Sequence, residues 1–181
     1  RDYYLEHLPL QIVLRAAPQG GYPYLCVGSA GSPGVFGSGV NAAGLCVADS
    51  RVRSKDEGFG LPAYALMMYL MENCESVPAA LSYLRQAERM GGSNLILADK
   101  EGRLAVFETG HQNYGLLESN GSHEAQGGFL VSTNHFVTPD LQAKDFSGPL
   151  RKNSVRRYER LSQELKATWG EIEADWAQKI M

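Results

Sequence analysis

The feature that most constrains this fold is a glycine-rich run at residues 28–45, GSAGSPGVFGSGVNAAGL. Glycine permits positive φ angles and the close approach of other groups, so such a run favours tight turns over a continuous helix. The run lies between two apolar segments, at residues 22–27 and 45–48. We therefore predict short strands connected through a ridge of small residues.

A phosphate-binding loop is the main alternative for this run, and the spacing argues against it. Gly37, Gly39 and Gly44 do not have the GxGxxG spacing of a dinucleotide site, and no GK[ST] sequence follows. No helical pattern opens directly afterwards, so the helix N-terminus that would help to bind phosphate is missing. We predict turns here and no cofactor.

Composition limits the remaining classes of protein. The chain has 181 residues, of which 44% are hydrophobic and 20% charged, so we predict one globular domain over residues 1–181. The net charge is −3 without a basic block, so we expect no nucleic-acid partner. There is neither a long apolar run nor a signal peptide, and we expect no membrane association.

Cysteine and histidine spacing argues against disulfides and metals. The chain has an odd number of cysteines, namely Cys26, Cys46 and Cys74, and they lack CxxC spacing. This pattern favours neither a disulfide framework nor a zinc site. The histidines lack the i,i+4 spacing of a helical metal pair, so we expect no metal. Cysteine usage of this kind leads us to expect a cytoplasmic protein.

Both ends of the chain are interpreted as cut. The sequence begins at Arg1 and ends at Met181 inside an apolar periodic segment without a stop signal. We therefore expect the central part of a longer domain. An incomplete sheet would leave an unpaired strand edge and an apolar groove, so we predict a homodimer or strand swapping through that edge.

Hydrophobic periodicity predicts strands and helices in an α+β order. Residues 7–16 alternate between apolar and polar side chains, which is typical of a half-buried strand. Further strands are predicted at 22–27, 45–49, 94–98 and 104–108, and a hairpin of 114–118 with 129–133. Helices are predicted at 62–73, at 76–90 and from 153 onward. This order suits an αββα sandwich of two facing antiparallel sheets, with the first two helices on one side and the last on the other.

Four short motifs follow one another along the chain. They are Gly39-Val-Asn-Ala-Ala-Gly-Leu45, then Ser93-Asn-Leu-Ile-Leu-Ala-Asp99 with Gly102, then Thr133-Asn-His-Phe136, then Ser154-Val-Arg-Arg157. The ordered set resembles the penicillin acyltransferase-like and choloylglycine hydrolase-like families of N-terminal-nucleophile (Ntn) amide hydrolases. The resemblance covers nearly the whole chain and implies the αββα four-layer Ntn fold.

The resemblance also implies roles for particular residues. In an Ntn hydrolase the first residue of the mature chain, here expected to be Cys, attacks the amide, and its own α-amine acts as the base. The resemblance places Asp2 beside that α-amine, Asn134 in the oxyanion hole and Arg157 next to the nucleophile. Ser50 stands where the family often has an Asn, and it is expected to bind substrate together with His135. A serine side chain is shorter than that of Asn and donates one hydrogen bond, so Ser50 departs from the family pattern of a second amide donor in the oxyanion hole.

The nucleophile itself is not in this sequence. Arg1 is not Cys, Ser or Thr, so we expect the nucleophile upstream and the chain alone to be inactive. Cys26 and Cys46 lie in apolar strand runs and have no free α-amine, so both are expected to fill the core. No G-x-S-x-G sequence is present, which argues against an α/β-hydrolase serine.

Two classes of function stay open at this point. The first is an amide hydrolase or acyltransferase acting on a linear C–N amide bond of a small molecule, with acyl-CoA as one candidate acyl donor and water or an amine as acceptor. The second is a non-catalytic αββα binding module that has lost the nucleophile. In that second case Asp2 would be a solvated terminal residue, Asn134 a turn residue bonded to local backbone, and Arg157 an exposed helix residue.

Overall fold

A computed structural model describes residues 9–35, 37–119, 128–168, 171, 173 and 175–176. Its described strands form one antiparallel sheet of seven in sequence order, β1 to β7. The strands are β1 Gln11–Ala16, β2 Tyr24–Ser29, β3 Ser38–Asn41, β4 Cys46–Arg51, β5 Ser93–Ala98, β6 Leu104–Thr109 and β7 Tyr114–Ser119. The helices are α1 Ala63–Asn73, α2 Val77–Gln86, α3 Pro139–Gln142 and α4 Pro149–Ala167.

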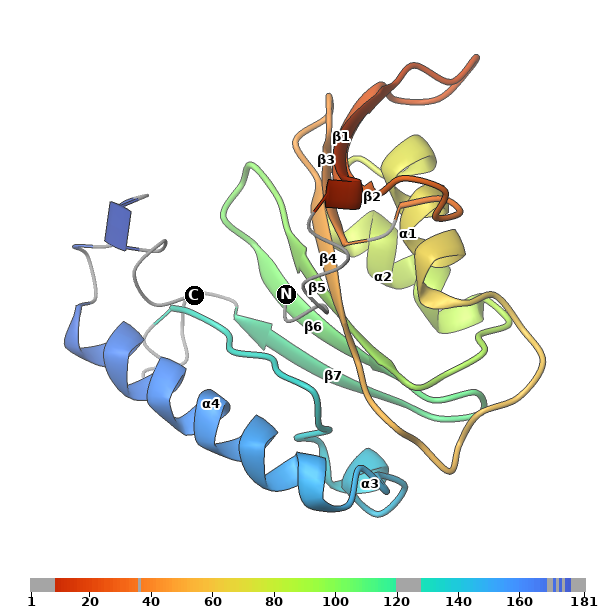
Figure 1. The fold of residues 1–181 in the computed structure, drawn as a ribbon. Coiled ribbons are helices and arrows are strands. Elements are labelled where there is room, and N and C mark those ends of the chain that lie inside the picture. The colour runs from red at the N-terminus through yellow and green to blue at the C-terminus, as the bar shows by residue number, and fades with distance from the viewer. Residues whose placement is uncertain are drawn as a thin grey trace.

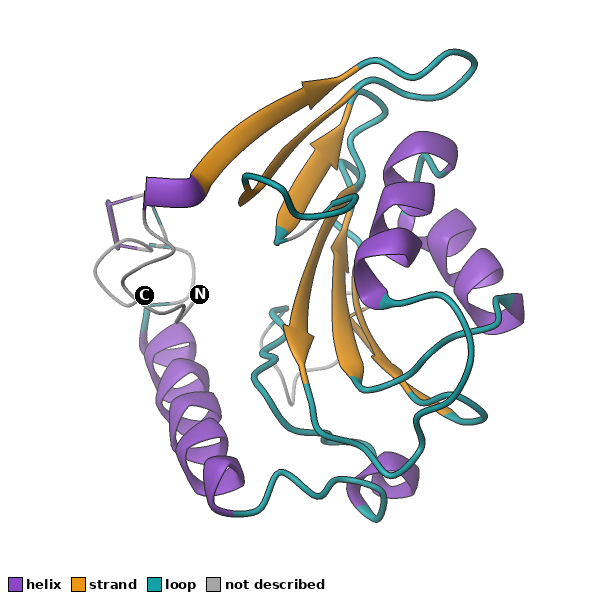
Figure 2. Cartoon of the chain, turned by 45° about the vertical axis from the view of Figure 1, so that its right-hand side comes forward, coloured by secondary structure: helices purple, strands orange, loops and turns teal. Residues whose placement is uncertain are grey.

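The helices lie on two sides of the sheet. Figure 1 shows α1 and α2 packed against one face and α4 on the opposite side, and the rotated view in Figure 2 agrees. The short helix α3 lies beside β7 and leads into α4 (Figure 1). The α+β class and the predicted placement of the helices on opposite sides are confirmed.

The main core lies between the sheet and the pair α1–α2. Alternate residues of a strand point to the same face, so Val47, Leu97 and Ala105, which are paired across β4, β5 and β6, share the face toward these helices. They pack with the apolar stripe of α1, which consists of Leu66, Met67, Leu70 and Met71. This burial of apolar surface is the main force holding the helix pair on the sheet.

The GVNAAGL motif connects the glycine-rich hairpin to the end of α1. Asn41 is buried, and its Nδ2 donates to the carbonyls of Met71 at 3.0 Å and Cys74 at 2.7 Å. Its Oδ1 accepts from the backbone N–H groups of Ala43 and Leu45, which closes the turn. Gly44 has φ +96°, a conformation that side-chain-bearing residues rarely adopt. The motif therefore has a structural role: it closes the turn between β3 and β4 and binds the C-terminal end of α1.

The described strands belong to one of the predicted antiparallel sheets, and the described residues form no second sheet facing it. Two predicted strand features are wrong in the described part of the chain. Strand β1 is not half-buried, because Val13 is 72% exposed and its neighbours are also accessible. Residues 129–133 form no strand with β7, which pairs with β6 alone among the described strands. The carbonyl oxygen of Thr133, at the end of that stretch, is bonded to side chains instead.

Helix α4 begins earlier than predicted. It starts at Pro149 after Gly148 instead of at Asn153 or Ser154. Proline is well tolerated in the first helical turn, since its missing N–H would have no partner there. Ser154 is consequently inside the helix, where it is buried and bonded to the segment that follows β7. The two predicted helices before β5 are confirmed, including the cap of α2 by Ser76.

The outer strands are open on one side in the described structure. β1 pairs only with β2 and β7 only with β6 among the residues described. Homodimerisation through such an edge stays a prediction. None of the described helices is long and apolar enough to cross a membrane.

We expect Asn41→Ala to lower the free energy of unfolding by about 2–3 kcal/mol, because it leaves buried backbone groups without partners. Urea denaturation of the purified chain would measure this. Asn73→Ala is the control: Asn73 is exposed on α1 and donates one local hydrogen bond to the Tyr69 carbonyl. Equal stabilities for the two variants would contradict the assigned role of Asn41.

Candidate active site

The candidate site is built around residues 128–138, which we call the crossing segment. This stretch runs between the face of the sheet opposite α1 and α2 and the helix α4 (Figure 1). It carries the predicted residues Asn134 and His135. Its position is set from two directions, by polar side chains of β4, β5 and β6 and by polar side chains of α4.

The sheet holds the crossing segment through its backbone. Ser50 and Asn94 are directly paired across β4 and β5, and both donate to the carbonyl oxygen of Thr133 at 2.8 Å. The same Nδ2 of Asn94 also donates to the carbonyl of His135 at 3.0 Å. Backbone groups that a strand ladder would have satisfied are thus bound by side chains, which explains why no strand forms here.

Glu108 extends this row onto β6. It is fully buried and pairs with Asn94 in the sheet register. Its carboxyl group accepts from the backbone N–H of Val137 at 2.5 Å and of Thr138 at 3.0 Å, and from the Thr138 hydroxyl at 2.5 Å. Burial raises the pKa of Glu108 even though these hydrogen bonds act in the opposite direction. The carboxyl group anchors the C-terminal end of the crossing segment.

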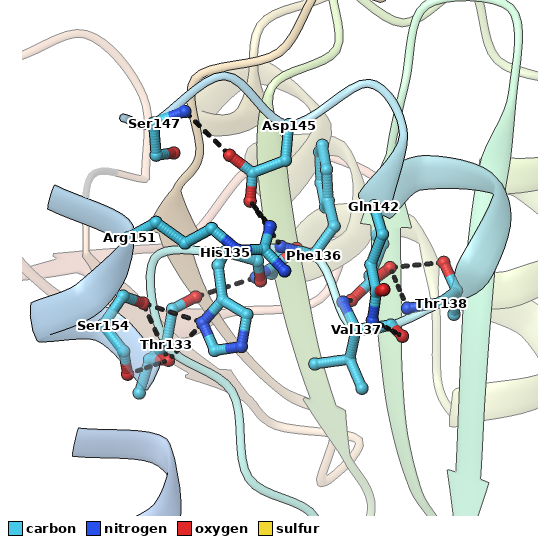
Figure 3. Close-up of polar contacts among 12 residues, drawn as sticks. Thr133, His135, Phe136, Val137, Thr138, Gln142, Asp145, Ser147, Arg151 and Ser154 are labelled. Atoms are coloured by element: carbon cyan, nitrogen blue, oxygen red, sulfur yellow. Dashed lines mark hydrogen bonds and ion pairs between the residues drawn. The ribbon is translucent and has the colours of Figure 1, made fainter. Parts of the chain in front are cut away.

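A buried polar cluster joins the crossing segment to α4. His135 Nδ1 lies 2.8 Å from Ser154 Oγ and 3.1 Å from Thr133 Oγ1, as Figure 3 shows. The Thr133 hydroxyl donates to the Ser154 carbonyl at 3.1 Å. The ring of Tyr158 meets the His135 ring edge-on, with the centroids 5.5 Å apart. This cluster fixes α4 against the segment.

An ion pair fixes the start of α4. The Arg151 guanidinium lies 2.7 Å from the carboxylate of Asp145, which also accepts from the backbone N–H of Ser147 (Figure 3). Burial lowers the pKa of His135, the positive charges of Arg151 and Arg157 lower it further, and the Asp145 carboxylate acts in the opposite direction. The net effect disfavours the protonated imidazole, so His135 is neutral near pH 7.

The structure brings Asn134 and Arg157 together although they are 23 positions apart. Arg157 Nη2 donates to Asn134 Oδ1 at 2.9 Å, and Arg157 Nε donates to Asn153 Oδ1 at 2.9 Å. Asn134 Nδ2 donates to the carbonyl of Arg51 at 2.9 Å. A carboxamide nitrogen carries two hydrogens, so the amide has a second N–H with which to bind an anionic oxygen.

The other predicted site residues differ in their placement. Asp2 lies outside the described residues. Ser50 donates its one hydroxyl hydrogen to Thr133, so in this conformation it supports the segment and does not point a donor at a ligand. His135 is 5% exposed and its Nδ1 is occupied by the buried cluster. Substrate binding by Ser50 and His135 stays a prediction, whereas their part in holding the crossing segment is visible.

The sequence analysis missed three residues of this site: Asn94, Glu108 and Ser154. A signal existed for two of them. Asn94 follows Ser93 at the start of an apolar strand, and Glu108 ends the apolar run LAVFE, so each places a polar side chain at a position where the core is expected. Ser154 opens the fourth motif, but no polar residue in an apolar run marks it as buried, because its burial depends on where α4 lies.

The cysteines are not placed as catalytic groups. Cys26 and Cys74 are buried, and burial raises the pKa of both thiols. The expectation that Cys46 fills the core is wrong, because Cys46 is exposed on β4; desolvation nevertheless raises the pKa of its thiol as well. A raised pKa lowers the fraction of reactive thiolate. Among the described residues, no group of three His, Cys, Asp or Glu side chains is arranged to hold a metal ion.

A groove runs beside the crossing segment. It has a volume of about 330 Å³ and lies between Phe129 and Val131 on one side and Tyr158, Ser162 and Lys166 of α4 on the other. This volume is at the lower end of the range for small-molecule sites. Neither Asn134 nor Arg157 lines the groove.

Comparison with known proteins agrees with this architecture. A family model described as acyl-coenzyme A:6-aminopenicillanic acid acyl-transferase matches residues 1–178. Crystal structures of two variants of conjugated bile acid hydrolase from Clostridium perfringens superpose with a TM-score of 0.59 at 17% identity, over 88% of this chain and 62% of theirs. Penicillin V acylase from Agrobacterium tumefaciens is 20% identical over 60% of this chain and 38% of its own, with a TM-score of 0.47. No curated protein sequence matches.

The bile acid hydrolase likeness concerns the fold and covers less than two thirds of that enzyme. It places the described sheet and helices within an Ntn-hydrolase fold, as the sequence motifs predicted. The family match spans nearly the whole chain, in agreement with the order of the four motifs.

The lowered pKa of His135 predicts a loss of stability in acid. Below the unfolded-state pKa of about 6.5 the unfolded chain binds a proton that folded His135 resists, so the free energy of unfolding falls as the pH drops from about 7 to about 5. His135→Gln should flatten this dependence. Urea denaturation at several pH values would measure it in both proteins. The raised pKa of Glu108 acts with the opposite sign and is present in both, so it cancels in the comparison. Parallel curves would contradict the assignment.

Proposed function

Because this chain belongs to the acyl-coenzyme A:6-aminopenicillanic acid acyl-transferase family, we propose that the complete protein cleaves a linear C–N amide bond of a small molecule. The acyl group would pass to water or to an amine. Family membership and the Ntn-type fold support the reaction class. The contact between Asn134 and Arg157 is the observation that carries the proposal.

The proposed nucleophile is an N-terminal cysteine upstream of this sequence. Its thiolate attacks the amide carbonyl and forms a tetrahedral intermediate, while its α-amine takes up the thiol proton. The C–N bond then breaks, the amine leaves with that proton, and the acyl group remains as a thioester. Water or a second amine attacks the thioester and releases the thiol. Asp2 is proposed to hold the α-amine.

Asn134 is proposed to stabilise the tetrahedral oxyanion through its second N–H. Fixed donors of this kind are effective because they need no reorganisation as charge develops. Arg157 binds the amide oxygen, which withdraws electron density from the Nδ2 group and makes it a stronger donor. The same guanidinium would favour the thiolate form of a neighbouring cysteine. Arg157 thus supports both the nucleophile and the oxyanion.

The groove beside α4 is proposed to receive the apolar part of the substrate. Phe129, Val131 and Tyr158 supply its apolar wall, and Lys166 lies at its rim with a positive charge. A small acyl or amide substrate fits this volume.

In the complete, processed protein, Asn134→Ala should lower kcat for amide hydrolysis by about 10²–10³ with little change in KM, because one oxyanion donor is lost. Steady-state kinetics with a panel of N-acyl substrates would measure this. Asn73→Ala on the opposite, helix-covered side is the control. A processed protein that binds these ligands without turnover would leave the non-catalytic binding module as the function.

Cys26→Ala should keep kcat within about twofold and lower the free energy of unfolding by about 1 kcal/mol, since Cys26 fills core on the α1 side. The same kinetic assay, with urea denaturation alongside, would test it. Loss of turnover in a variant that remains folded would point to an internal thiol nucleophile and would count against the upstream cysteine.

A further inference from the structure

Asn94 is placed unusually for a residue of an apolar strand. It belongs to β5, has the sequence SNLILA around it, and is 1% exposed. Its Nδ2 donates to the carbonyls of Thr133 and His135, which are the residues on either side of Asn134. One side chain therefore holds the backbone directly before and directly after the candidate oxyanion residue.

We propose that Asn94 is a positioning residue that sets the orientation of the Asn134 amide. This inference rests on the proposed function, because Asn134 matters for catalysis only if it binds the oxyanion. Asn94 itself touches neither substrate nor the reacting atoms in this proposal. It acts through the backbone of the crossing segment.

The chemistry of the contact requires a carboxamide. Two carbonyl oxygens converge on one nitrogen, and a carboxamide offers two N–H donors in a plane from a single atom. An aspartate of the same shape has no donor and would oppose the carbonyls with a third oxygen. Among the described residues no donor reaches Asn94 Oδ1, which is buried. The position therefore uses only the donor end of the side chain, although leaving a buried acceptor unpaired is unfavourable.

Asn134 is consequently held at both its backbone and its side chain. The backbone is held from the sheet by Asn94, with Ser50 as a second donor to the Thr133 carbonyl. The side chain is held from α4 by Arg157 and from β4 by the Arg51 carbonyl. An oxyanion donor must be placed within a fraction of an ångström to be effective, so release of the backbone moves the donor out of position.

The chain contains a matched control for this role. Asn41 is also a buried asparagine whose Nδ2 donates to two carbonyl oxygens, those of Met71 and Cys74. These carbonyls lie on the helix-covered side of the sheet, away from the crossing segment. Asn94→Asp therefore removes two N–H donors beside the candidate site, and Asn41→Asp removes two equivalent donors far from it.

The first measurement is steady-state kinetics of the complete, processed protein on an N-acyl substrate that it turns over. Asn94→Asp should lower kcat by about 10–100-fold with KM changed by less than about twofold, as expected for a misplaced catalytic group. Asn41→Asp should keep kcat within about twofold, although both substitutions lower Tm. Equal kcat values for the two variants would overturn the proposal.

The second measurement separates Asn94 from the proposed function. The side-chain ¹⁵N–¹H₂ signals of Asn134 can be followed by NMR in the full chain without any turnover. Asn94→Asp should shift these signals and speed their hydrogen exchange, whereas Asn41→Asp should leave them in place. Unchanged Asn134 signals in folded Asn94→Asp would overturn the proposal. Absence of amidase activity in the wild-type protein would instead overturn the proposed function.

A milder variant covers the case in which Asn94→Asp does not fold. Asn94→Ser keeps one donor without introducing a charge. It should give a smaller shift of the same Asn134 signals and a smaller loss of kcat than removal of both donors. Wild-type signals and wild-type kcat in folded Asn94→Ser, with lowered Tm, would reduce Asn94 to a structural residue and overturn the proposal.

Discussion

The site depends on side chains that replace a strand ladder. The crossing segment lies over the sheet without joining it, and its backbone groups are bound by Ser50, Asn94 and Glu108 from three adjacent strands. Buried backbone groups require partners, so these polar residues are what allow an irregular segment to lie in the interior. Without them the segment would have no fixed path between the sheet and α4.

The two faces of the sheet are therefore held mainly by different kinds of contact, although Phe136 of the crossing segment also packs in a small apolar cluster with Val52 and Leu141. The face toward α1 and α2 is held by apolar packing, which is non-directional and tolerates changes in shape. The opposite face meets the crossing segment through directional hydrogen bonds, and the cluster of Thr133, His135 and Ser154 joins that segment to α4. Directional contacts fix atomic positions more tightly than apolar packing does, which is what a catalytic group requires.

The same arrangement explains how residues far apart in sequence act as one unit. Asn134 lies in the crossing segment and Arg157 in α4, and they meet because the segment is held on the sheet and α4 on the segment. The Asp145–Arg151 ion pair and the early start of α4 at Pro149 set where along the helix Arg157 projects. The strands therefore position the crossing segment and the crossing segment positions α4, in both cases through buried polar contacts.

Sequence by itself determined the α+β class, the Ntn-type family and the helix pair before β5. It also predicted that Asn134 and Arg157 lie together, as their hydrogen bond shows, while their catalytic roles stay a prediction. These follow from local patterns, since periodicity, caps and short motifs are written in consecutive residues. Only the tertiary structure decided that residues 129–133 are not a strand. It also decided that Ser50 binds the crossing segment from the sheet, that His135 bonds this segment to α4, and that Asn94 donates to the carbonyls on both sides of Asn134. Each of these depends on which buried carbonyl lies opposite which side chain, and that is set by packing between segments 19 to 83 residues apart.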